Sequence, residues 1–230
     1  MKINLITVCT DTYPIEYATK ITRRFKQLSD LDVTSYCITD RPLQLTRETE
    51  PIEPFVKAEG WWNKMLMYSP EMPKGWNLYL DLDMILLKNF DAEILHSIEN
   101  GYRVSCVKDP IAWHNNLYNS SFVIFKTGQL TEIYDKWLPD RKRLREFEGG
   151  DQVWTGQLFK ELGIQPYYMD NKYPSLKKSL KYGVAENVTE KGMQVPTQQP
   201  KGLNVLECNG RPKPHEMGSI SWIKKNWHDI

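Results

Sequence analysis

The first forty residues constrain the fold most, because they have the pattern of a strand, a helix and a second strand. Residues 3–9 form a short apolar run that ends at Thr10-Asp11-Thr12. Apolar side chains then recur every three or four residues from 15 to 28, which is the period of an amphipathic helix. Residues 33–38 alternate and are rich in strand-forming types. This order predicts an α/β fold whose first two strands are parallel.

The rest of the chain continues the α/β pattern with less regular spacing. We expect a helix at 61–68, a second one opened by Asp151 as N-cap and ended at Gly163, and strands at 76–80, 102–107, 121–125 and 203–207. Between 165 and 202 the periodicity weakens and several prolines occur, which predicts a functional loop or a lid. We expect 203–230 to close the site described below.

Length and composition predict one globular domain over residues 1–230. Hydrophobic residues make up 40% of the chain and charged residues 26%, which is ordinary for a folded domain. The formal net charge of +1 argues against a protein that coats nucleic acid, although local basic patches are compatible with it. The 8 Trp, 12 Tyr and 7 Phe would suit sugar or base pockets as well as a core.

The four cysteines are too far apart for a zinc motif or a dense disulfide framework. Cys9, Cys37 and Cys106 lie in apolar, strand-like runs, where a free thiol behaves as a small buried side chain. The opening apolar run is too short for a secretory signal, and no later segment is long enough to span a membrane. We therefore expect a cytoplasmic protein with reduced thiols.

Two aspartates follow the apolar strand at 76–80. In an extended backbone Asp81 and Asp83 point to the same side, and open α/β sheets bind ligands where their strands end. Two close carboxylates repel each other, and Mg²⁺ or Mn²⁺ would bridge them to a diphosphate. Asp-x-Asp is also common at solvated strand ends, so the tripeptide alone leaves both interpretations open.

Several segments, taken in order, resemble the GT-A fold glycosyltransferases, and most closely the glycogenin-like retaining family 8. The resemblance covers nearly the whole chain and is carried by Thr7-Val8-Cys9-Thr10-Asp11-Thr12-Tyr13, Lys64, Leu78-Tyr79-Leu80-Asp81-Leu82-Asp83, Asn119-Ser120-Ser121, Gly150-Asp151-Gln152 and Gly210-Arg211-Pro212-Lys213-Pro214. It implies one GT-A domain with a Rossmann-like mixed sheet flanked by helices.

The resemblance also implies an activity and a set of site residues. The enzyme would be a hexosyl- or pentosyltransferase that uses a nucleotide-sugar donor, most often a UDP-sugar, with retention of configuration. The nucleotide would contact Thr7, Val8, Cys9, Asp11, Tyr13, Lys64 and Lys213; the sugar would contact Asn119, Ser120, Asp151 and Gln152, of which Asp151 and Gln152 would be catalytic. Asp81 and Asp83 would hold Mn²⁺ or Mg²⁺.

The closing segment departs from the family pattern. Where the family usually supplies a histidine as third metal ligand, this chain has Glu207 or Asn209, which share one face of a strand. A carboxylate or amide oxygen would favour Mg²⁺ or Mn²⁺ over zinc. The alternative is weaker metal binding or none.

Other functions and several acceptors are compatible with the same residues. A haloacid-dehalogenase-like phosphatase also carries Asp-x-Asp, normally on its first strand, and a nucleotide-sugar-binding module without turnover would fit the missing histidine. The acceptor would be a glycan, a lipid-linked sugar, a protein or a nucleic-acid base. The basic run 141–145, together with Lys177, Lys178 and Lys181, would suit an anionic acceptor, and one of Trp61 and Trp62 would line its pocket.

Overall fold

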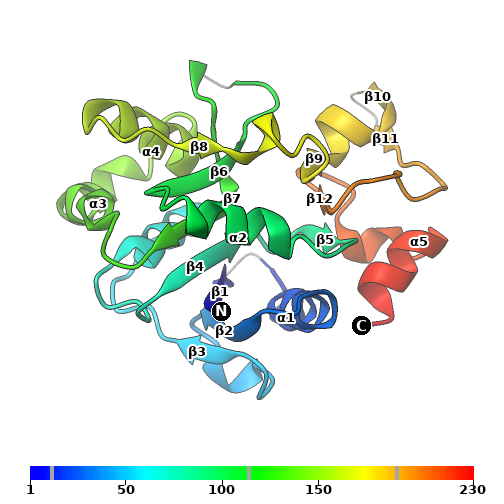
Figure 1. Ribbon diagram of the computed structural model, residues 1–230, viewed down its shortest axis with the longest axis horizontal. Helices are drawn as coiled ribbons and strands as arrows, with labels where there is room; N and C mark the ends of the chain where they lie inside the picture. Colours follow the sequence, from blue (N-terminus) through cyan, green and yellow to red (C-terminus); the bar gives the residue numbers. More distant parts are fainter. Residues whose placement is uncertain (11–12, 113–114, 190–191) are drawn as a thin grey trace.

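A seven-stranded mixed sheet lies at the centre of the structure, a computed structural model that describes residues 1–10, 13–112, 115–189 and 192–230 (Figure 1). Its strand order is β3-β2-β1-β4-β7-β6-β8. Strand β7 runs antiparallel to both of its neighbours, and the other pairs are parallel. The strands are β1 (Lys2–Val8), β2 (Asp32–Ile38), β3 (Glu50–Ile52), β4 (Trp76–Leu80), β6 (Val104–Lys108), β7 (Tyr118–Lys126) and β8 (Tyr167–Tyr168).

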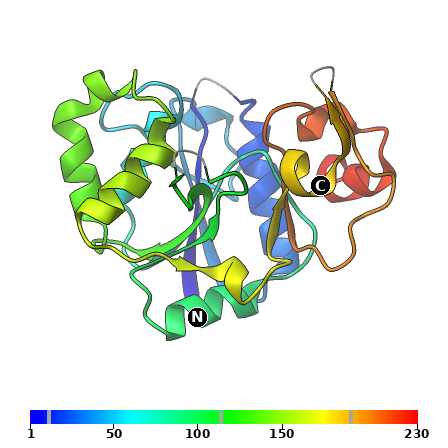
Figure 2. The ribbon, with the colours of Figure 1, turned by 90° about the horizontal axis from the view of Figure 1, so that it is seen from above.

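Each face of this sheet is covered by its own helices. Helices α1 (Glu16–Leu28) and α2 (Asp91–Glu99) pack on one face, and α3 (Thr131–Leu144), α4 (Gly150–Glu161) and the 3₁₀ helix η2 (Gly60–Tyr68) pack on the other (Figure 2). Alternate strand residues face opposite sides, so Leu5 joins one core and Ile6 the other. The apolar strands at 76–80 and 121–125 are therefore buried on both faces.

A second, three-stranded sheet brings distant segments to the end of β4. In it β12 (Val205–Glu207) pairs antiparallel with β5 (Met84–Leu86) and parallel with β9 (Lys177–Ser179). The remaining elements are η1 (Pro42–Gln44), η4 (Met169–Asn171), η5 (Leu180–Val184), β10 (Glu186–Thr189), β11 (Gly192–Gln194), η6 (Pro214–Met217), α5 (Ser221–Ile223) and η7 (Lys224–His228).

The predicted α/β fold and mixed sheet are confirmed, with differences in detail. Helix α4 begins at Gly150, because Gly149 adopts the left-handed conformation just before it, so Asp151 lies in the first turn and is not the N-cap. Gly163 is also left-handed and follows the end of this helix, as expected. The segment 165–202 contains strands β8 to β11, whose pairing partners, except within the β10–β11 hairpin, lie far away in the sequence.

The four cysteines are free and buried, which agrees with the absence of a disulfide framework. Among the described residues, none of the helices combines the length and apolar character that crossing a membrane would require.

Candidate active site

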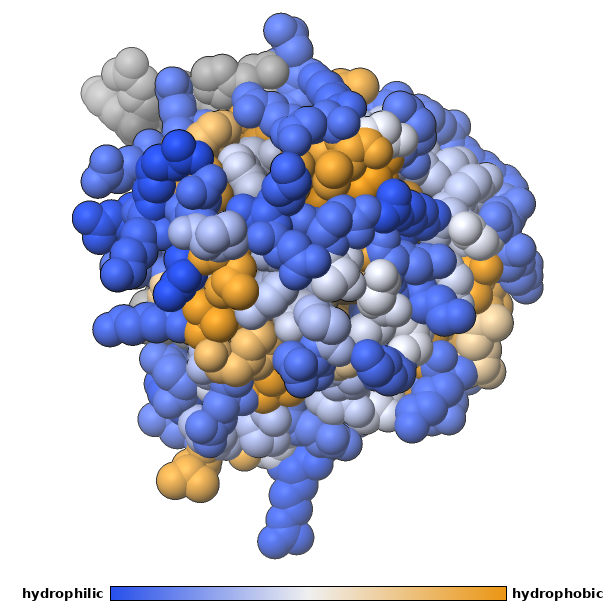
Figure 3. Space-filling view, turned by 90° about the vertical axis from the view of Figure 1, so that its left-hand side faces the viewer, coloured by the Kyte–Doolittle hydropathy of each residue, from blue (hydrophilic) through white to orange (hydrophobic). Residues whose placement is uncertain are grey.

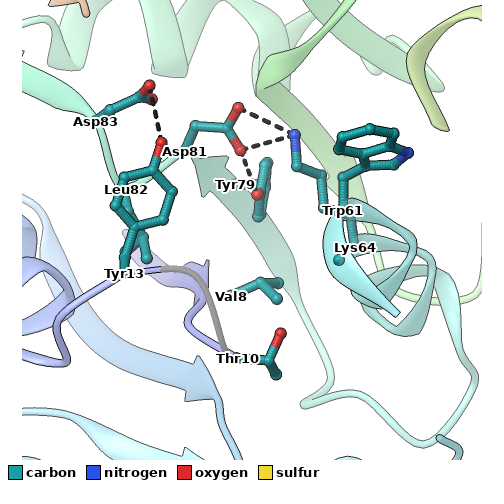
Figure 4. A pocket seen from close by; sticks show the side chains of 10 residues that line it. Val8, Thr10, Tyr13, Trp61, Lys64, Tyr79, Asp81, Leu82 and Asp83 are labelled. Carbon is teal, nitrogen blue, oxygen red and sulfur yellow. Dashed lines mark hydrogen bonds and ion pairs between the residues drawn. The ribbon is translucent and has the colours of Figure 1, made fainter. Parts of the chain in front are cut away.

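Asp81 begins the turn that follows β4 and lies at the edge where β6 also ends and β7 begins. Its backbone N–H donates to the carbonyl oxygen of Ser121 on β7 (2.9 Å). Its Oδ1 lies 2.9 Å from Lys64 Nζ and accepts a hydrogen bond from the Tyr79 hydroxyl at 2.5 Å (Figure 4). The side chain of Asp81 is therefore held by a cation from η2 and a phenol from β4.

Asp83 is held in the same way from the opposite side. Lys213 Nζ donates to its Oδ2 at 2.6 Å, and the Tyr13 hydroxyl donates to that oxygen at 3.2 Å. The backbone oxygen of Asp83 accepts the N–H of Cys208 (2.8 Å), which ties the turn to the end of β12. Burial raises the pKa of Asp83, which is 7% exposed; the Asp81 carboxylate raises this pKa further, and Lys213 opposes the rise.

A third lysine–carboxylate pair lies beneath these two. Lys177 Nζ donates to Glu207 Oε2 (2.7 Å), Ser121 Oγ (2.8 Å) and Asn119 Oδ1 (3.2 Å), and its side chain is 3% exposed. From the sequence, Lys177 was predicted to form a basic cluster with Lys178 and Lys181 that would suit an anionic acceptor. This prediction is wrong for Lys177. The parallel pairing of β9 with β12 places its ammonium inside the protein.

The two candidates for a third metal ligand already have partners within the protein. The Glu207 carboxylate pairs with Lys177, and Asn209 Oδ1 accepts the Ser179 hydroxyl at 2.7 Å. Within the described ranges, no three His, Cys, Asp or Glu side chains gather closely enough to hold a metal ion. The oxygens that fit a hard cation are those of Asp81 and Asp83, because both carboxylates line the same hollow.

Asp151 and Gln152 lie next to this cluster, in the first turn of α4. The Gln152 amide is fixed at both ends: its Oε1 accepts the Ser120 N–H at 3.1 Å, and its Nε2 donates to Asp109 Oδ2 at 2.5 Å. The sequence analysis missed Asp109. The available signal was its position, since it directly follows β6 at the edge where Asp81 follows β4.

Asp151 carries an acceptor atom that the protein leaves unused. The residue is 5% exposed, and its Oδ2 has no hydrogen-bond partner among the described residues, although Lys64 Nζ lies 3.8 Å away. Burial raises the pKa of this carboxyl, and Lys64 opposes the rise. Burial also lowers the pKa of Lys64, but Asp151 and Asp81 outweigh it and keep the ammonium charged. A buried oxygen without a hydrogen-bond partner, beside a hollow, is suited to a hydroxyl donor from a ligand.

Three hollows adjoin one another along this edge. The β2 hollow, of about 490 Å³, includes Thr10, Asp40 and Asn63 in its lining. Thr10 also lines the aspartate hollow, of about 240 Å³, which contains Asp81 and Asp83. The glutamine hollow, of about 410 Å³, contains Gln152, Asp151, Ser120 and Glu207, and it shares Trp61, Lys64 and Asp81 with the aspartate hollow. These three neighbouring hollows are together called the trough.

The residues predicted to contact a nucleotide are divided between this trough and the core. Val8 and Tyr13 line the aspartate hollow. Thr7 lies on β1 and Cys9 directly follows it, and both residues are buried, so their side chains are not available to a ligand. The backbone N–H of Cys9 donates to Ile38 and its carbonyl oxygen accepts the Thr39 hydroxyl. Burial raises the pKa of the Cys9 thiol to about 12. Asp11 lies outside the described residues.

The two adjacent tryptophans have different positions, as the sequence indicated. Trp62 is 3% exposed and belongs to the core, whereas Trp61 is 57% exposed and stands between the aspartate and glutamine hollows (Figure 4). A Cβ atom at Gly150 would lie 2.6 Å from Trp61 Nε1, so glycine at this position lets the indole rest against the start of α4.

Comparison with known proteins identifies the fold. No protein-family profile matches the sequence, and no curated protein matches it. Solved structures do match. The galactosyltransferase LgtC, in complex with donor and acceptor sugar analogues, is 12% identical with a TM-score of 0.62, over 96% of this chain and 93% of LgtC. The chain has the GT-A glycosyltransferase fold. The expectation from the sequence motifs is thus confirmed for the fold.

Other proteins of the GT-A fold match to a similar degree. GlyE from Streptococcus pneumoniae is 13% identical with a TM-score of 0.61, over 93% of this chain and 56% of GlyE. Mouse xyloside xylosyltransferase 1 is 13% identical with a TM-score of 0.54, over 92% of this chain and 100% of that one. The phosphatase alternative is not supported, because Asp81 and Asp83 follow β4 and not the first strand.

Proposed function

We propose that this chain is a glycosyltransferase that moves a sugar from a UDP-sugar to an acceptor, with retention of configuration. The observation that carries the proposal is the position of Asp81 and Asp83. In a GT-A fold both line the aspartate hollow, and Asp81 also lines the glutamine hollow, where a buried Asp151 oxygen has no hydrogen-bond partner among the described residues. This arrangement suits a molecule with a diphosphate in its middle and a polar ring at one end.

The nucleotide would lie in the β2 and aspartate hollows. Tyr13 presents its ring there, and Lys213 Nζ stands 5.2 Å from the centre of that ring. Lys64 and Lys213 flank the two aspartates, so their ammonium groups would face the diphosphate from two sides. Glycosyl transfer develops positive charge on the sugar and negative charge on the departing diphosphate. Cations fixed near those oxygens stabilise the transition state more than the bound substrate.

Asp81 and Asp83 would hold Mn²⁺ or Mg²⁺. Three lysines of the site, Lys64, Lys177 and Lys213, form ion pairs with four carboxylates, those of Asp81, Asp83, Asp151 and Glu207, which leaves one negative charge in excess. A diphosphate would add further negative charge, which a divalent cation would balance. When bound, such an ion would neutralise the negative charge that develops on the departing diphosphate. Glu207 is not needed in this arrangement, because Lys177 already neutralises it.

The transferred sugar would occupy the glutamine hollow. The Oδ2 of Asp151 would accept a sugar hydroxyl, with Ser120 in the same lining. Asn119 does not line this hollow, and its Oδ1 accepts Lys177 Nζ and the Ser121 N–H. Gln152, fixed between Ser120 and Asp109, would hold its amide near the anomeric carbon. One matched structure is an active-site mutant of LgtC in which a glutamine is replaced by glutamate, so a glutamine belongs to the active site of a protein with this fold.

The proposal is tested by measuring UDP release from a panel of UDP-sugars, with Mn²⁺ or with a chelator. We expect release in the presence of Mn²⁺ and its loss in Asp83→Asn, a variant that should remain folded. Asp140→Asn, an exposed carboxylate on α3, is the matched control and should keep full activity. Release by Asp83→Asn at the rate of the unmodified chain would contradict the proposal.

The binding module without turnover remains a second candidate, favoured by the engagement of Glu207 with Lys177. A module of this kind would be stabilised by UDP in a thermal unfolding experiment and would release no UDP from any sugar donor. A chain that no uridine nucleotide stabilises would contradict both functions.

A further inference from the structure

Two further hollows lie between Trp61 and the carboxyl end of α3. A hollow of about 350 Å³ shares Trp61 with the glutamine hollow, and its lining also includes Trp62, Arg145 and two acidic residues, Glu59 and Glu146. A smaller one of about 160 Å³, here called the α3 hollow, follows it and shares Trp62 and Arg145. The acceptor has to reach the transferred sugar from the side away from the nucleotide. These two hollows lie on that side.

The α3 hollow is rich in positive charge. It is lined by Lys57, Arg141, Lys142 and Arg145 with one acidic side chain, Glu59. Glu59 lies 3.7 Å from Arg145, in a pair exposed to solvent. Within the described part of the chain, Lys57, Arg141 and Lys142 have no acidic partner. By contrast Arg143, on the same helix, pairs with Asp140 at 2.7 Å and does not line the hollow.

We propose that the α3 hollow is a phosphate subsite, and that the acceptor of this enzyme carries a phosphate group. This inference rests on the proposed function and names the chemistry of its acceptor. Several cations around so small a space match a phosphate, which has three acceptor oxygens and up to about two negative charges. A single carboxylate would leave most of these cations without a partner.

Trp61 supplies the connection between the phosphate subsite and the reaction. Its exposed indole offers a flat face on which a sugar or base ring of the acceptor can stack. The phosphate would then lie beyond this ring, away from the reacting hydroxyl. The face of the molecule that carries α3 is mostly hydrophilic, with hydrophobic residues only in separate small patches (Figure 3). The subsite is therefore suited to a charged acceptor group in water.

The test compares a double variant with a matched control on the same helix. Arg141→Gln/Lys142→Gln removes two of the unpaired cations, and Arg143→Gln removes an exposed arginine outside the hollow. Glucose, glucose 6-phosphate, glucuronate and a thymidine oligonucleotide are titrated into each UDP-saturated protein by calorimetry, at two salt concentrations. UDP release from the donor without acceptor is measured in parallel.

We expect glucose 6-phosphate or the oligonucleotide to bind at least about tenfold more tightly than glucose, because hydrogen bonds to charged groups contribute more than neutral ones. A tenfold difference corresponds to about 1.4 kcal/mol. The preference should disappear in the double variant, persist in Arg143→Gln and weaken in high salt. Which of the two phosphate compounds binds shows whether the acceptor's phosphate belongs to a sugar phosphate or to a nucleic acid.

Equal binding of glucose and both phosphate compounds would overturn the inference, as would equal preference for glucuronate or an unchanged preference in the double variant. Because binding is measured apart from turnover, failure of the proposed function shows separately, as absence of UDP release from the unmodified chain.

Discussion

Replacing Lys177 with methionine tests whether its buried ion pair organises the floor of the site. The change leaves the Glu207 carboxylate buried without its cation and removes a donor from Ser121 and Asn119. Breaking a buried pair by removing one partner costs about 3–5 kcal/mol. For a chain of this length each kcal/mol lowers Tm by about 2–4 °C, so we expect a fall of roughly 6–20 °C.

A double-mutant cycle separates the pair from the packing around it. Glu207→Gln in the Lys177→Met background removes the stranded charge, and replacing both members of a buried pair is often nearly neutral. We therefore expect the double variant to regain much of the lost free energy of unfolding. Urea unfolding followed by tryptophan fluorescence measures all four proteins of the cycle.

Lys178→Met is the matched control, because this neighbouring lysine on β9 is exposed. It should change the free energy of unfolding by no more than about 0.5 kcal/mol. If Lys177→Met costs no more than this control, or if Glu207→Gln recovers nothing, Lys177 is not the buried partner of Glu207 and the explanation for the missing third metal ligand fails.

Further predictions concern the tryptophan pair, Asp151 and the thiol of Cys9. Trp62→Ala should cost about 3–5 kcal/mol in urea unfolding, whereas Trp61→Ala should cost about 0.5 kcal/mol or less and raise the KM for the acceptor; equal stability losses would contradict their assigned positions. Burial raises the pKa of Asp151, so its protonated form favours the folded state, and this advantage is lost as pH rises from the unfolded value of 3.8 through the folded pKa. Asp151→Asn should therefore be more stable than the unmodified chain near pH 7, by a margin that shrinks toward pH 4; a margin independent of pH would refute the cause given. Because burial raises the pKa of Cys9 to about 12, its thiol should react with a disulfide reagent at pH 8 only after unfolding, and rapid reaction of the folded chain would show that Cys9 is accessible.

Local patterns in the sequence determined much of this fold. The strand, helix and strand at the start, the apolar strand at 76–80 and the helix end at Gly163 were predicted correctly. Each depends on side-chain periodicity or on a backbone preference within a few residues. The position of Asp81 and Asp83 just after this strand was also predicted correctly, but the reason given for their proximity was wrong: residues 82–83 form a turn and are not extended.

Tertiary structure alone decided which charges meet. Lys177 and Glu207 are 30 residues apart, and Lys213 and Asp83 are 130 apart. Whether a lysine lies on the surface or inside depends on the register of a short strand against its neighbour, and a shift of one residue exchanges the two faces. Lys177 and Lys178 are alike in sequence, and only the pairing of β9 with β12 buries the first and exposes the second.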